Sequence, residues 1–182
     1  MFIEVIPQQK QDCSHPVFKI KKLSSPLRKL KPCVKIAEKP MYDNVYIVDL
    51  SSELASEGSV DAVLTFRNLH NWLGPQMDSI FANSYKALKP GGIFGVVEHR
   101  ANKGTSIKNM KKSGYVSEEH AIMVAKRHGF TLVAKSEINA NKKDTKDYPK
   151  GVWTLPPNLR LKTIDKEKYI AIGESDRMTL LF

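Results

Sequence analysis

Little in this sequence favours a secreted, membrane-spanning or disulfide-stabilised protein. Its 182 residues include only two cysteines, Cys13 and Cys33, and their spacing matches neither a zinc motif nor a disulfide framework. No stretch approaches the roughly 18–20 apolar residues that cross a bilayer. The N-terminus also lacks the basic and apolar regions of a signal peptide. We therefore expect a cytoplasmic protein with reduced thiols and no membrane association.

Glycine is scarce in the N-terminal third, where the first one is Gly58. No glycine fingerprint for a dinucleotide is therefore present. Lysine and arginine, by contrast, are abundant and give the chain a net charge of +10. Because the lysines are spread along the chain and no recognition motif accompanies them, they are typical of a solvated surface. We do not expect nucleic-acid binding, whereas an acidic substrate or a phosphate-bearing partner stays open.

The chain begins with an irregular part and continues with a regular one, which we interpret as a single domain over residues 1–182. Residues 2–6 have the composition of a short strand. The basic segment 8–40 is rich in Lys, Ser and Gln, and its prolines interrupt any long helix. We predict that this segment is irregular.

Strands and helices alternate after residue 44. The predicted strands are 45–50, 62–66, 93–97, 130–134 and 178–182, with one helix after Pro75 and another capped by Ser117. The inner face of the first helix is indicated by the spacing of Met77, Ile80, Phe81, Ser84 and Leu88. This alternation predicts an α/β fold with a mostly parallel sheet. The last two strands have no obvious helix between them, which favours an antiparallel pair at the C-terminal edge.

The most specific motif lies in Asp61–Glu98, which reads DAVLTFRNLHNWL, then a helix, then ALKPGGIFGVVEH. This pattern resembles class I S-adenosylmethionine-dependent methyltransferases, which have a Rossmann-like sheet. The stretches GYVSEEH, INANKKDTKDYPKGVWTLPP and ESDRMTLLF resemble a group of predicted, mostly uncharacterised bacterial methyltransferases. The resemblance covers about Val45 to Phe182. It implies S-adenosyl-L-methionine as the cofactor and methyl transfer to an unidentified acceptor.

The N-terminal part departs from the family pattern, which begins with a strand and an acidic, glycine-rich turn that holds the cofactor. Nothing before Asp61 has that form. The opening FIEVIP resembles the second strand of the family. We therefore expect an N-terminally truncated domain that lacks the first strand and leaves an apolar gap in the sheet. The alternative function is a non-catalytic methyltransferase-like protein or a partner-binding remnant.

Candidate cofactor contacts follow the strands, because open α/β sheets bind ligands beyond the carboxyl ends of their strands. The resemblance implies that Glu4 binds the ribose hydroxyls, and a carboxylate suits a vicinal diol. It implies that Asp49 and Leu50 contact the adenine and that Asn68 faces the sulfonium. The alternatives are a solvent-exposed Glu4 and an Asp49 that only forms a turn.

The candidate catalytic residues are His70, Glu98 and His99. His70 follows one buried strand and would face the methyl acceptor, whereas Glu98 or His99, after the next strand, could accept its proton. His70 could instead be a hydrogen-bonded residue at a helix start, and His99 could pair with a carboxylate for structural reasons. The three could also be metal ligands, but they lack a local ligand spacing, so we predict no metal.

The candidate substrate residues come from the same polar cluster and from the loop 139–157. A loop of this length is uncommon in a compact domain unless it is functional or disordered. Its aromatic residues suggest an ordered lid, and Arg160 could meet an acidic group of the substrate. The predicted substrate contacts are Asn71, Tyr148, Trp153 and Arg160. Trp72, which follows the polar cluster, and Asp61, which precedes the strand 62–66, are interpreted as structural residues.

Overall fold

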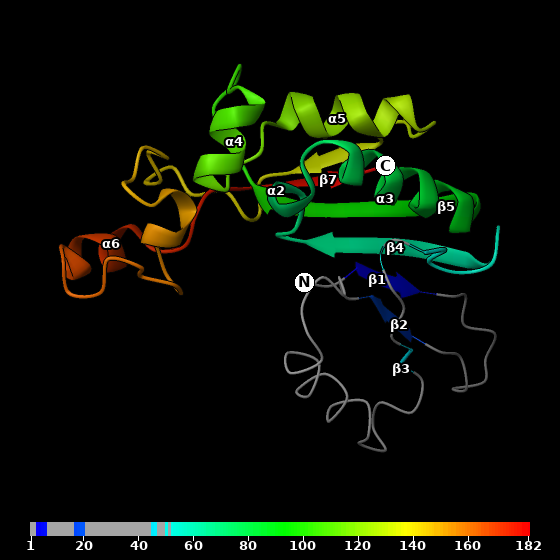
Figure 1. The fold of residues 1–182 in the computed structure, drawn as a ribbon, viewed down its shortest axis with the longest axis horizontal. Coiled ribbons are helices and arrows are strands. Elements are labelled where there is room, and N and C mark those ends of the chain that lie inside the picture. The colour runs from blue at the N-terminus through cyan, green and yellow to red at the C-terminus, as the bar shows by residue number, and fades with distance from the viewer. Residues whose placement is uncertain (1–2, 7–16, 21–44, 47–49, 51) are drawn as a thin grey trace. The chain divides into compact units, whose positions relative to one another are not determined.

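The computed structural model describes residues 3–6, 17–20, 45–46, 50 and 52–182 (Figure 1). The chain separates into two compact units. The first comprises Met1–Phe66 and Asp78–Gly95, and the second comprises Arg67–Met77 and Val96–Phe182. None of the helices in the described ranges is both long and apolar enough to span a bilayer.

The first unit is built on strands hydrogen-bonded in the order β3-β2-β1-β4-β5. Strand β1 runs antiparallel to both β2 and β4, and β2 runs parallel to β3. Figure 1 shows β1 beside β4, with β2 and then β3 further from it. The strands are β1 (Ile3–Ile6), β2 (Val17–Ile20), β3 (Val45–Tyr46), β4 (Val60–Phe66) and the first part of β5 (Leu88–His99).

The N-terminal strand corrects one expectation about the sheet. Strand β1 pairs directly with β4, with Val5 opposite Val63, so the apolar gap expected beside β4 is not present in the described strands. Strand β2 falls within segment 8–40, which had been predicted to be irregular throughout. The predicted strand 45–50 is described as a strand only at Val45–Tyr46. The expectation of a truncated domain stays a prediction.

Helix α3 (Pro75–Ala87) confirms the helix predicted after Pro75. Ile80, Phe81 and Ser84 are buried, and Phe81 packs edge-to-face against Phe94 of β5 at a centroid distance of 4.9 Å. Leu88 lies in β5 rather than on the helix, because the chain becomes extended there.

The LKPGG turn lies at the start of β5 and runs close to β4. A Cβ on Gly92 would lie 3.1 Å from the carbonyl oxygen of Asp61, so this position favours glycine. The Asp61 carboxylate accepts hydrogen bonds from Lys89 at 3.1 Å. This ion pair is consistent with the structural role expected for Asp61.

The second unit has strands in the order β5-β7-β6. Strand β6 runs antiparallel to β7, with Lys135 opposite Leu180, which confirms the predicted C-terminal edge pair. The elements are α2 (Leu69–Trp72), α4 (Ile107–Ser113), α5 (Glu118–Arg127), β6 (Ala134–Ser136), η3 (Gly151–Thr154), α6 (Lys166–Ile172) and β7 (Arg177–Leu181).

The helices of this unit were predicted only in part. Ser117 caps α5 as expected, because its side chain accepts a hydrogen bond from the N–H of His120. Helices α4 and α6 were not predicted, so the last two strands do have a helix between them. The strand predicted at 130–134 instead occupies Ala134–Ser136. Trp72 is fully buried, as expected of a packing residue.

Candidate functional site

Three predicted site residues, His70, Glu98 and His99, come together in the second unit. His70 lies on α2, and Glu98 and His99 are the last two residues of β5. One ligand-type atom from each lies within 4.8 Å of the others. The two imidazole rings have a centroid distance of 5.4 Å. We call these three residues the histidine cluster.

The turn before α2 brings His70 to the end of β5. Arg67 has a φ of 56°, a left-handed conformation that is uncommon for a residue with a side chain. Its N–H donates to the carbonyl of Val97 at 2.7 Å, which ties the start of α2 to β5. Strained backbone of this kind is frequent at functional sites, where surrounding contacts maintain it.

Glu98 is fully buried, and its carboxylate is compensated by three donors. Its oxygens accept from the N–H of His99 at 2.7 Å and the N–H of His70 at 3.2 Å. The His70 ring nitrogen Nδ1 lies 3.0 Å from Oε1. A buried carboxylate has only acceptors to offer, so Nδ1 must carry the proton. The Glu98 carboxylate therefore selects the His70 tautomer whose Nε2 is an acceptor, and Asn71 Nδ2 lies 2.9 Å from it.

The environment of His99 keeps its imidazole uncharged at neutral pH. Burial lowers its pKa to about 4; Glu98 opposes this shift, whereas the positive charges of Arg67 and Arg177 add to it. Its Nδ1 lies 2.5 Å from the hydroxyl oxygen of Ser175, a buried residue that precedes β7. Ser175 was not among the predicted site residues; the only sequence signal was its place in the ESDRMTLLF stretch.

Trp153 and Arg160, two of the predicted substrate contacts, lie next to the histidine cluster. The Trp153 ring meets the His70 ring edge-on at a centroid distance of 5.9 Å. The guanidinium of Arg160 lies over the same indole, 4.6 Å from the ring centre. Trp153 therefore contacts His70 with an edge-to-face geometry and also lies beneath the Arg160 guanidinium.

Two glycines allow η3 to pack closely against α4 and so place Trp153. A Cβ on Gly151, which has a φ of 57°, would lie 2.1 Å from the carbonyl oxygen of Ser113. A Cβ on Gly114 would lie 2.7 Å from Val152 and 3.0 Å from the Trp153 ring. A side chain at either position would collide with the neighbouring segment, so the close packing of η3 against α4 favours glycine at both.

A second polar network surrounds Asp176 in the same unit; we call it the arginine network. Arg100 donates to the Asp176 carboxylate at 2.9 and 3.1 Å and to Glu137 at 2.6 and 2.8 Å. Lys146 adds an ion pair to Asp176 at 2.8 Å. Burial would raise the pKa of Asp176, but these cations and the N–H of Asn141 outweigh it and lower the pKa to about 2.

The arginine network continues through a buried tyrosine. The Tyr115 hydroxyl donates to Asp144 at 3.1 Å, and the N–H of Asp176 donates to the other Asp144 oxygen at 2.7 Å. Burial and the Asp144 carboxylate raise the pKa of Tyr115, which stays protonated. Every strong donor and acceptor here meets a partner of the opposite kind, as expected of a structural network.

The remaining predicted contacts lie elsewhere or are not described. Asn68 is buried at the N-cap position of α2. Leu50 is buried in the first unit. The backbone of Glu4 pairs with Leu64 on β4, while its side chain and the whole of Asp49 lie outside the described residues. Tyr148 packs against Tyr169 at 5.9 Å, a different partner from those of Trp153.

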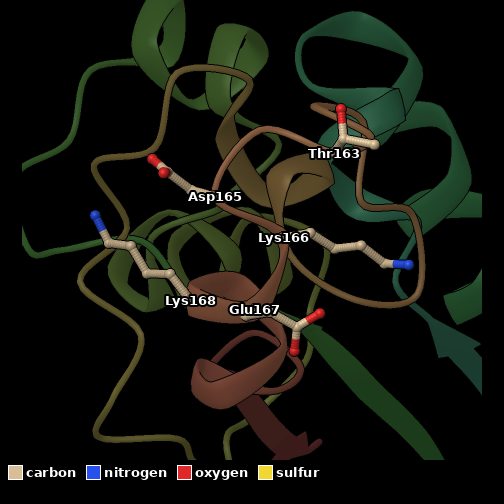
Figure 2. A pocket seen from close by; sticks show the side chains of 5 residues that line it. All are labelled: Thr163, Asp165, Lys166, Glu167 and Lys168. Atoms are coloured by element: carbon tan, nitrogen blue, oxygen red, sulfur yellow. The ribbon is translucent and has the colours of Figure 1, made fainter.

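A surface hollow of about 460 Å³ lies at the start of α6, and none of the residues predicted for the site lines it. Figure 2 shows its side chains diverging, with Lys166 and Lys168 pointing to opposite sides. No group of polar side chains converges there on a ligand, so we assign it no function. It is lined by Thr163, Asp165, Lys166, Glu167 and Lys168.

Comparisons with solved structures identify the fold. The structure is similar to the [4+2]-cyclase SpnF, with a TM-score of 0.62 and 17% identity over 94% of this chain and 67% of that one. It is also similar to an S-adenosylmethionine-dependent methyltransferase from Mesorhizobium loti, with a TM-score of 0.51 and 12% identity over 90% of this chain and 78% of that one.

A third similar structure is the 1,6-didemethyltoxoflavin-N1-methyltransferase of Burkholderia thailandensis, solved with S-adenosylhomocysteine. The TM-score is 0.51 and the identity 12%, over 90% of this chain and 59% of that one. No protein-family model and no curated protein matches the sequence. The chain therefore has the Rossmann-like α/β fold of methyltransferases, with a mixed sheet. SpnF, a cyclase, shows that this fold alone does not determine the reaction.

Proposed function

We propose that this protein transfers a methyl group from S-adenosyl-L-methionine to a small acidic acceptor, with His70 as the general base. The observation that carries the proposal is the hydrogen bond from His70 Nδ1 to the buried carboxylate of Glu98. A histidine whose far nitrogen is oriented by a buried carboxylate is the arrangement that enzymes use to accept a proton.

The three residues have different roles. Glu98 is a positioning residue, because three protein donors occupy its oxygens and it has no exposed surface. His70 Nε2 accepts the acceptor's proton once the exposed Asn71 amide swings away, and Glu98 then balances the imidazolium charge. His99, uncharged and tied to Ser175, forms the neighbouring wall of the site.

The nature of the acceptor is suggested by the groups around His70. The indole of Trp153 offers a flat apolar surface next to the base, and Arg160 places a positive charge on that surface. Arg67 and Arg177 add positive potential near His99. A planar hydroxyl- or amine-bearing compound with a carboxylate or phosphate group would match this combination. The role proposed for Tyr148 finds no support in these contacts.

The cofactor would supply an activated methyl group, so the protein needs only to bind, orient and deprotonate the acceptor. The histidine cluster provides an oriented imidazole for the deprotonation of the acceptor. We assign cofactor binding to Glu4, Asp49, Leu50 and Asn68, following the resemblance. Of these, the amide of Asn68 lies at the carboxyl end of β4, where open α/β sheets bind their ligands.

Calorimetric titration of the full chain with S-adenosylhomocysteine tests cofactor binding first. We expect micromolar affinity that falls about tenfold or more in Glu4→Ala and Asp49→Ala. The matched control is Glu53→Ala, because this exposed carboxylate pairs only with Lys86 at 2.6 Å in the described structure. A folded chain that does not bind would overturn the proposal and favour a non-catalytic protein with the same sheet.

The base is tested with methyl-labelled S-adenosylmethionine and a panel of aromatic hydroxy and amino acids. We expect His70→Ala to lower kcat about 10²–10⁴-fold, the usual contribution of a general base, while cofactor affinity stays unchanged. His128→Ala, at the C-terminal end of α5, is the control. Full activity in the His70 variant would exclude this residue as the base.

A further inference from the structure

The histidine cluster has a property that methyl transfer does not require. It is the one group of three or more His, Cys, Asp or Glu side chains, within the ranges that the structure describes, whose arrangement could hold a metal ion. One nitrogen from each imidazole and one carboxylate oxygen lie within 4.8 Å of one another. Two imidazoles and a carboxylate form a ligand set that Zn²⁺ accepts in proteins.

We propose that His70, Glu98 and His99 bind a divalent transition-metal ion such as Zn²⁺, which replaces the proton between His70 Nδ1 and Glu98. This inference does not depend on methyl transfer, and it describes a metal-bound form in which His70 Nε2 carries the proton, so that His70 does not act as a base. It depends on the positions of three side chains in the second unit and on the groups that hold them.

The spacing of the ligand atoms requires only a small adjustment. Zinc–nitrogen and zinc–oxygen bonds of about 2.0–2.2 Å place tetrahedral ligands roughly 3.3 Å apart. His70 Nδ1 and Glu98 Oε1 already lie 3.0 Å apart. The largest separation within the set is 4.8 Å, so rotation of one side chain would close it. Two of the three ligands are consecutive residues at the end of β5, which makes their backbone positions rigid.

The contacts around the two imidazoles match those of metal-binding histidines, which usually direct their second nitrogen to a polar group. His99 Nδ1 meets the Ser175 hydroxyl at 2.5 Å, which leaves Nε2 available to coordinate. His70 Nε2 meets the Asn71 amide at 2.9 Å. When Nδ1 coordinates a metal, the proton moves to Nε2, and a rotated Asn71 amide accepts it through its oxygen.

The chemistry of the ligands favours zinc-like ions over Mg²⁺ or Ca²⁺. Imidazole nitrogens suit Zn²⁺, Co²⁺ and Ni²⁺, whereas Mg²⁺ and Ca²⁺ prefer oxygen ligands. The buried Glu98 carboxylate supplies the negative charge. Three protein ligands leave a fourth coordination position for water or another small ligand.

The proposal is tested on the full chain by calorimetric titration with Zn²⁺ and by the visible absorption of added Co²⁺. We expect one ion per chain with a Kd of micromolar or below, and the intense Co²⁺ bands of a four-coordinate site. His70→Ala and His99→Ala should each weaken Zn²⁺ binding more than tenfold. His128→Ala, outside the cluster, should bind like the parent chain.

Ser175→Ala distinguishes a built site from adventitious binding and keeps the proposal testable if a ligand variant fails to fold. Loss of a partner of a ligating histidine typically weakens metal affinity about 10–100-fold, and we expect this here. Zn²⁺ should also raise the Tm of the parent chain and not that of His99→Ala. Equal Zn²⁺ affinity in the parent, His99→Ala and Ser175→Ala chains would overturn the proposal. Cofactor binding is measured separately, so failure of one proposal leaves the other intact.

Discussion

The histidine cluster and the arginine network adjoin each other at consecutive residues of two segments. His99 contacts Ser175, whereas the next residue, Arg100, contacts Asp176. The N–H of Arg100 donates to the carbonyl of Asp176 at 2.9 Å, which connects the two segments at this point.

The partners of the buried carboxylates differ between the two networks. Asp176 forms ion pairs with Lys146 and Arg100, and Arg100 stays charged because hydrogen bonds to Glu137 and to Asp176 raise its pKa. Glu98 meets a histidine, which can gain, lose or exchange its proton for a metal ion. The ion pairs of Asp176 therefore suit a structural role, whereas the pair of Glu98 and this histidine is the one for which we propose a chemical role.

We expect the largest loss of stability when the charge at the centre of the arginine network is removed. Asp176→Ala leaves Lys146 and part of Arg100 without a counter-charge, so we expect stability to fall by roughly 3 kcal/mol or more. Urea denaturation followed by circular dichroism measures this loss. A change below about 1 kcal/mol would show that the network behaves like an exposed ion pair.

Glu98→Gln should have a smaller effect on stability and a different one on function. The amide NH₂ cannot accept the hydrogen bonds that the carboxylate receives, so we expect a loss of roughly 1–3 kcal/mol. The same variant should also lose Zn²⁺ affinity, which Asp176→Asn should retain. Parallel denaturation and Zn²⁺ titration of the two variants would separate the networks. Equal Zn²⁺ affinities would contradict the comparison.

Acid should weaken the arginine network over a defined pH range. The pKa of Asp176 is about 2 in the folded chain and 3.8 in its usual state, so the folded carboxylate binds its proton less readily. Its stabilisation is complete above pH 4 and is lost as the pH falls from about 4 to 2, by at most about 2 kcal/mol. The difference in urea midpoint between the parent and Asp176→Asn should therefore shrink over this range. A difference independent of pH would refute this prediction.

The smallest expected effect on stability belongs to Ser175→Ala. It removes one hydrogen bond to His99 and should cost about 1 kcal/mol. The variant should therefore have a Tm only a few degrees below that of the parent. Its Zn²⁺ affinity should nevertheless fall about 10–100-fold. A pronounced loss of stability would mean that Ser175 supports the fold more than the histidine cluster.

Most of the regular structure after residue 60 could be predicted from the sequence, since apolar periodicity and caps are local signals. Strand β4, the inner face of α3 and the Ser117 cap are examples. Short elements were missed, because α6 buries only Tyr169 and α4 only Met110, too few residues for a periodic pattern. The start of β6 was misplaced because the apolar run 130–133 precedes the pairing with β7.

The sequence proposed the members of the candidate site but not their arrangement. The rule that ligands bind beyond strand ends selected His70, Glu98 and His99, and the resemblance added the cofactor contacts. Ser175 could not be found, because its importance comes from a contact between residues 76 positions apart in the chain. The sequence raised His70, Glu98 and His99 as possible metal ligands, but it offered no local ligand spacing, because His70 and Glu98 are 28 positions apart.

The sequence by itself determined the α/β alternation, the edge pair and the polar residues at the strand ends. These follow from side-chain spacing and from turn residues such as Pro90 and Gly91, which act within a few positions. Only the tertiary structure decided which histidine meets which partner and that Trp153 lies against His70. It also decided that Glu98 pairs with a histidine and Asp176 with an arginine. These contacts depend on how segments distant in the sequence pack together.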